Sequence, residues 1–143
     1  MHTESEYKAA SLHEVRLAIL RQHTQLAQLL DELESHANRV IKGEYCTSAL
    51  HDALVLLHSR FGRHLDYEET RLLPLLGAAP RDAANVLRAA LGDHADQRAR
   101  IDGLLHDRTV FTDARTLARE ALAFVHAIRV DMAEEDSGLR ALG

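Results

Sequence analysis

Six residues with metal-ligating side chains interrupt the apolar positions of this sequence. Apolar residues recur every three or four positions along four stretches, as on one face of an amphipathic helix. Near the middle of each stretch ligand-type residues take their place, and these are His23, His64, Glu68, His94, Asp131 and Glu135. A buried polar side chain without a partner costs about 1–3 kcal/mol, so six in one core would oppose folding. Metal ions are the simplest partners that would hold them together.

The spacing of these residues suits a pair of metal ions. His64 and Glu68 are four residues apart, as are Asp131 and Glu135, so each pair lies on one helical face. A carboxylate can bridge two ions while imidazoles bind from the sides. Three imidazoles and three carboxylates therefore suit two first-row ions, with positions left for water, hydroxide or dioxygen. The alternative is a metal-free network of core polar groups, in which Arg98 pairs with Asp131 or Glu135.

Helices must position these residues. Residues 1–10 are predicted to be a loose, flexible tail, and residues 11–143 one domain. Start signals predict helices that begin at the Ser11–Glu14 capping box, at Thr47 or Ser48, near Arg81, and after a turn at 107–112 capped by Thr112.

The apolar face of the second helix, Leu50 to Leu75, matches that of the fourth, Leu117 to Leu142, position for position. His23 and His94 correspond in the other two helices. The third face is expected to continue through Arg98 to Leu105. Short loops make successive helices antiparallel. The prediction is an all-α, up-down-up-down antiparallel four-helix bundle with a pseudo-twofold internal repeat.

Composition excludes several classes of protein. The net charge is −5 with acidic and basic residues interleaved, which argues against nucleic-acid binding. No apolar run approaches the ~20 residues of a membrane span, and the N-terminus does not resemble a signal peptide. Cys46 is the single cysteine and is expected in a turn, so no internal disulfide forms. We expect a cytoplasmic protein that is a monomer or a weak dimer.

Three segments resemble a known family. FGRHLDYEETRLLPLL at 61–76 looks like the hemerythrin-like HHE signature, LGDHADQRARIDGLL at 91–105 like its third helix, and HAIRVDMAEEDSGL at 126–139 like its last. The resemblance implies a four-helix bundle that holds a non-haem, usually di-iron, centre. Zinc or manganese would also suit these ligands. By position, the implied ligands are His23, His64, Glu68, His94, Asp131 and Glu135.

The chain departs from the oxygen-carrying members of that family. The second histidine expected on their third helix is Arg98 here. His126 is the alternative to Glu135 as a ligand, since His126 and Asp131 match their last motif. Carboxylates in place of imidazoles favour ferric iron, which indicates sensing, iron handling or peroxide turnover rather than reversible oxygen carriage. The expected ligand is dioxygen, peroxide or nitric oxide, and a sensor would need a partner protein. The alternative function is a metal-free or mono-metal helical interaction module.

Overall fold

The computed structural model describes residues 3–44, 47–106 and 113–142, and over these ranges the chain is helical with no strand. The helices are α1 (Glu4–Ile41), α2 (Thr47–Tyr67), α3 (Arg81–Gly92), α4 (His94–His106) and α6 (Ala114–Arg140). The predicted all-α class is therefore confirmed. No helix in the described part of the chain is both long and apolar enough to cross a membrane.

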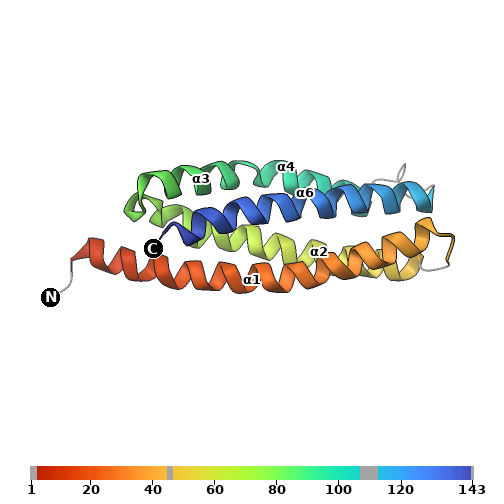
Figure 1. The fold of residues 1–143 in the computed structure, drawn as a ribbon, viewed down its shortest axis with the longest axis horizontal. Coiled ribbons are helices and arrows are strands. Elements are labelled where there is room, and N and C mark those ends of the chain that lie inside the picture. The colour runs from red at the N-terminus through yellow and green to blue at the C-terminus, as the bar shows by residue number, and fades with distance from the viewer. Residues whose placement is uncertain (1–2, 45–46, 107–112, 143) are drawn as a thin grey trace.

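The helices form a bundle in which α3 and α4 together occupy one position (Figure 1). Helix α1 contacts both α2 and α6, α3 contacts α6, and α4 contacts α2. Both ends of the chain lie toward the same end of the bundle (Figure 1). Asp113 caps α6 by accepting a hydrogen bond from the backbone N–H of Arg115. Thr112, the expected turn at 107–112 and Cys46 lie outside the described residues.

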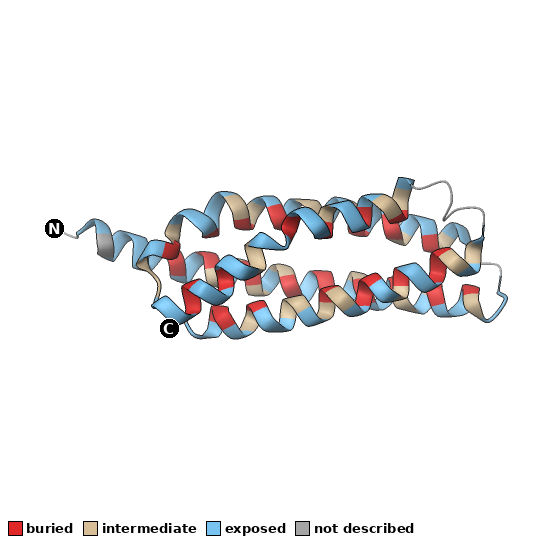
Figure 2. Cartoon of the chain, turned by 90° about the horizontal axis from the view of Figure 1, so that it is seen from above, coloured by how far each residue is buried: buried red, intermediate tan, exposed pale blue. Residues whose placement is uncertain are grey.

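Helix α1 begins at Glu4, so the predictions of a loose tail and of a start at Ser11 are wrong for residues 4–10. Thr3 Oγ1 accepts a hydrogen bond from the Glu6 N–H at 3.2 Å, and Glu6 Oε2 accepts one from the Thr3 N–H at 2.9 Å. This reciprocal capping box satisfies two backbone donors at the helix start. Residues 6–10 are exposed, and the start of α1 projects beyond the bundle (Figure 2). Local capping, rather than burial, accounts for this extension.

Two apolar clusters form the core. In sequence, residues of one cluster precede and residues of the other follow His23, Glu68, His94, Asp131 and Glu135, whereas His64 lies just before Leu65, the last residue of the first cluster on α2. One cluster contains Leu26 of α1 and Ile128 of α6, and the other contains Ile19 of α1 and Leu139 of α6. His23 therefore follows one cluster and precedes the other along α1. A polar layer thus interrupts the apolar core, as the sequence pattern predicts.

Two irregular segments change which residues face inward. After α2 the chain forms a π-helical turn, η1 (Glu68–Leu72), and a 3₁₀ turn, η2 (Leu73–Ala78). The π turn takes one residue more than a regular helical turn. Leu76 is consequently buried in place of the predicted Leu75, which is half-buried.

A break at Asp93 divides the third position of the bundle into α3 and α4. Gln97 and Leu104 are buried, whereas the predicted Arg98 and Leu105 are only half-buried. Gln97 and Leu104 thus take the places of Arg98 and Leu105, while His94 and Ile101 are buried as predicted. His94, the first residue of α4, is buried.

Candidate metal centre

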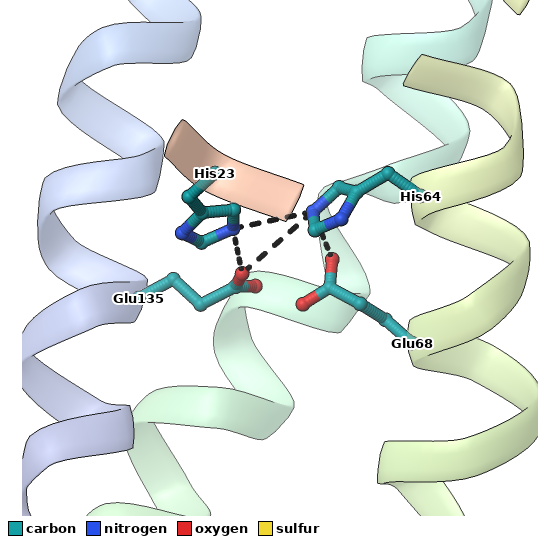
Figure 3. Close-up of side chains that lie close together, drawn as sticks. All are labelled: His23, His64, Glu68 and Glu135. Atoms are coloured by element: carbon teal, nitrogen blue, oxygen red, sulfur yellow. Dashed lines mark hydrogen bonds and ion pairs between the residues drawn. The ribbon is translucent and has the colours of Figure 1, made fainter. Parts of the chain in front are cut away.

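Four buried side chains from three directions converge at the middle of the bundle (Figure 3). They are His23 of α1, His64 of α2, Glu68 of η1 and Glu135 of α6, and one ligand atom from each lies within 4.8 Å of the others. His23 Nε2 lies 2.8 Å from Glu135 Oε1, and His64 Nε2 lies 3.0 Å from Glu68 Oε1. The two Nε2 atoms are 3.2 Å apart. The helices thus direct imidazole nitrogens and carboxylate oxygens at one small volume.

Glu68 connects this group to a third histidine. Its Oε1 atom lies 3.3 Å from Nε2 of His94, so the carboxylate contacts both His64 and His94. Its other oxygen, Oε2, is buried without a hydrogen-bond partner among the described residues. Buried carboxylate oxygens are normally satisfied. An unsatisfied oxygen beside two imidazoles suits a cation, and the donor set therefore fits a metal ion.

The outer nitrogens of the histidines face polar side chains. His23 Nδ1 lies 2.5 Å from Asp136 Oδ1, and His64 Nδ1 lies 2.7 Å from Gln22 Oε1. Because these oxygens accept a hydrogen bond from Nδ1, they leave Nε2 directed into the cluster. Metal-binding histidines usually make such an outer hydrogen bond, which orients the ring and fixes the ligating nitrogen.

His94 has a looser arrangement on its outer side. Its Nδ1 atom lies 3.4 Å from Glu69 Oε2 without meeting hydrogen-bond geometry. Arg98 binds Glu69 at 2.5 Å and Asp66 at 2.8 Å. These bonds to Arg98 lower the pKa of Glu69, so its carboxylate stays charged beside His94. Arg98 therefore pairs with neither Asp131 nor Glu135, contrary to the metal-free network considered from the sequence.

Burial and close contacts perturb the ionisation of the cluster. Burial alone would lower the pKa of His23, but hydrogen bonds to Asp136 and Glu135 raise it to about 9. Burial raises the pKa of Glu135 to about 8; the His23 hydrogen bond opposes this and the neighbouring Glu68 adds to it. Burial would also raise the pKa of Glu68, but its bonds to His64 and His94 outweigh this and lower it. Without a cation, protons must offset the repulsion between the two buried carboxylates.

A family comparison agrees with this geometry. The family model described as the hemerythrin HHE cation binding domain matches residues 17–142. The chain belongs to this family. Comparisons with curated proteins and with solved structures find no match.

Within this hemerythrin HHE domain, the remaining predicted ligand stands apart from the cluster. Asp131 is half-buried, and its Oδ2 atom accepts a hydrogen bond from Gln97 Nε2 at 2.9 Å. His126, the alternative to Glu135 as a ligand, is exposed. The structure therefore gathers His23, His64, Glu68 and Glu135, places His94 against Glu68, and leaves Asp131 on Gln97.

A cavity of about 440 Å³ adjoins the cluster of the hemerythrin HHE domain. All six predicted ligands line it, together with the apolar side chains of Phe61, Leu65, Ile128 and Met132. An apolar wall beside a few convergent polar groups is the usual character of a small-ligand site. The cavity therefore offers room for a small molecule next to the donor atoms.

Sequence reasoning missed the residues that orient the ligands. Gln22, Glu69, Gln97 and Asp136 are not among the predicted site residues. Gln22, Glu69 and Asp136 each neighbour a predicted ligand in the chain, and this adjacency was the available signal. It is a weak signal because consecutive residues of a helix point about 100° apart.

Proposed function

We propose that this hemerythrin HHE domain binds a non-haem di-iron centre that reacts with dioxygen, peroxide or nitric oxide. The observation that carries the proposal is the convergence of buried His23, His64, Glu68 and Glu135 within 4.8 Å. The outer hydrogen bonds of two of these histidines add support, because they prepare Nε2 as a ligand atom.

The proposed ligands are His23, His64, Glu68, His94, Asp131 and Glu135. Glu68 would hold the centre through its carboxylate, since it already contacts two histidines and its buried Oε2 atom has no hydrogen-bond partner among the described residues. Asp131 would have to exchange its hydrogen bond with Gln97 for a metal ion. Bound iron would supply a Lewis-acidic, redox-active cation to a small molecule in the adjoining cavity.

The protein's own groups would orient and shield this chemistry. Asp136 and Gln22 hold the rings of His23 and His64. Phe61 and Ile128 line the cavity and would exclude water from the donor atoms. Three carboxylates among the ligands favour ferric iron, so we propose sensing, iron handling or peroxide turnover rather than reversible oxygen carriage.

A mono-metal site is the second candidate, and a specific observation favours it. The group whose ligand atoms lie mutually close contains four residues, and neither His94 nor Asp131 belongs to it among the described residues. Such a site would hold one ion and leave His94 bonded to Glu68.

Metal analysis of protein produced in iron-supplemented cells tests these functions. If the centre is di-iron, each chain should contain a pair of iron ions, and ferric iron should absorb in the near ultraviolet. Half of that iron content would support the mono-metal site, and zinc or manganese without ferric absorption would replace iron in the proposal. Metal-free protein that gains none during refolding with iron would support a metal-free interaction module instead.

We also propose several features of organisation. The helices follow an up-down-up-down antiparallel order with a pseudo-twofold repeat, which the matching apolar faces of α2 and α6 support. We propose a single domain over residues 11–143, cytoplasmic and either monomeric or weakly dimeric, and a partner protein if the domain is a sensor. Light scattering across a concentration series tests the oligomeric state.

A further inference from the structure

A second cavity of about 440 Å³ lies in a groove between α1 and α2. Leu26, Leu29 and Leu56 supply its apolar surface. Leu56 is 42% exposed, so part of this surface is open to solvent. The volume lies within the range of small-molecule sites, roughly 300–1,000 Å³. Glutamine side chains on α1 add neutral hydrogen-bonding groups to the same groove.

Two arginines on α2 give this α1–α2 groove a positive charge. Arg60 and Arg63 both line it, are exposed, and lie three residues apart on one helical face. Neither arginine forms an ion pair or a hydrogen bond with another described residue. Arg98 and Arg129, by contrast, each bind two carboxylates. Two unpaired guanidinium groups beside an apolar surface suit an anion, and their planar forks match a carboxylate.

The groove also reaches the candidate metal centre. His64 lines both cavities, and Gln22, which accepts the hydrogen bond from His64 Nδ1, lines the groove. A molecule in the groove would therefore contact the amide that orients His64. Any shift of this amide changes the hydrogen bond at His64 Nδ1. The other ring nitrogen, Nε2, faces Glu68.

We propose that the α1–α2 groove binds an organic carboxylate with an apolar body, and that Gln22 transmits its occupancy to His64. Arg60 and Arg63 bind the carboxylate, and the leucines contact the apolar body. The binding step stands independently of the proposed function. The effect on a metal centre rests on the proposed function.

Titration calorimetry with octanoate tests the binding step in the full-length protein. Acetate, which lacks the apolar body, and octan-1-ol, which lacks the charge, should each bind about tenfold more weakly or worse. The double variant Arg60→Gln/Arg63→Gln should weaken octanoate binding by about tenfold or more. Arg88→Gln is the matched control, because Arg88 is an exposed arginine on α3 outside the groove. Equal octanoate affinity in the double variant and the wild type, or equal affinity for octan-1-ol, overturns the proposal.

Nitrogen NMR of the histidine side chains in metal-free protein tests the transmission step. Saturating octanoate should shift the Nδ1 resonance of His64. Gln22→Leu, compared with the wild type when both are saturated with octanoate, should abolish this response. An unmoved His64 resonance in the wild type overturns the coupling. Failure of the protein to bind iron would contradict the proposed function but would leave both of these measurements able to succeed.

Discussion

Asp136 accepts a hydrogen bond from Nδ1 of His23 at 2.5 Å, across the interface between α6 and α1. This carboxylate directly follows Glu135, so one turn of α6 both contacts Nε2 of His23 and orients its ring. Asp136, which is not one of the converging ligands, thus determines which nitrogen of His23 faces the cluster.

Asp136→Ala is accordingly expected to weaken metal binding by about 10- to 100-fold, the usual effect of removing an outer partner of a ligating histidine. Asp136→Asn keeps an acceptor oxygen and should weaken it less. Competition with a chelator measures both affinities. Glu120→Ala, an exposed carboxylate lost from the same helix, is the control. Wild-type affinity in Asp136→Ala would refute an orienting role.

Removing the ligands of α2 and η1 should have a larger effect. His64→Ala and Glu68→Ala are each expected to remove most of the bound metal, because these side chains contact each other and Glu68 also contacts His94. Elemental analysis of purified protein measures the stoichiometry, with His51→Ala, exposed on α2, as the control. If both variants retain full metal content, the assignment of the site is wrong.

Glu135 and His126, the two alternative ligands on α6, differ in burial. Glu135 is buried against His23, whereas His126 is exposed, so Glu135→Ala should impair metal binding more than His126→Ala. Metal titration of the two purified variants compares them directly. Loss of metal in His126→Ala with retention in Glu135→Ala would restore the histidine-rich motif of oxygen carriers and contradict the ligand set proposed above.

Bound metal should stabilise the fold. A ligand that binds the folded chain alone contributes about 2.7 kcal/mol at a concentration one hundred times its Kd. Chelation is therefore expected to lower the Tm of the wild type by several degrees, and readdition of metal should restore it. Thermal denaturation of Glu68→Ala with and without chelator is the control, since that variant should show little difference. An unchanged Tm in the wild type indicates a metal-free core network.

Two glycines in helices should respond oppositely to alanine. A Cβ atom at Gly62 would meet no heavy atom within 4 Å, so Gly62→Ala should stabilise the protein by up to about 1 kcal/mol through helix propensity. At Gly138 a Cβ would lie 2.9 Å from Val86 Cγ1 and 3.1 Å from Leu87 Cδ2. Overpacking of this kind costs about 1–3 kcal/mol. Urea denaturation should therefore give Gly62→Ala the higher free energy of unfolding; the reverse order would show that α3 yields freely at this contact.

Periodicity predicted much of this arrangement because burial on a regular helix repeats every three to four residues. His23, His64, Glu68, His94 and Glu135 are all buried, as predicted. The ligand assignment itself stays a prediction, because burial does not show what a side chain binds.

The errors have local causes. Gln97 replaces Arg98 on the buried face because both lie about one turn after His94, and steps of three and of four residues fit one helical face equally well. Thr3–Glu6 and Ser11–Glu14 both have the capping-box pattern, and apolar periodicity favoured the second although the first one caps α1. The partners of the histidines depend on contacts between helices that one helical face cannot encode.

The π-helical turn lies between the His64–Glu68 pair and the segment that contains Leu76. Glu68 is the first residue of this turn, and its carbonyl accepts the hydrogen bond from the Leu73 N–H. An insertion or deletion after Glu68 would rotate Leu76 and the segment that closes the bundle, but it would leave the spacing between His64 and Glu68 intact. Single-residue changes there would alter that end of the bundle while His64 and Glu68 keep their spacing.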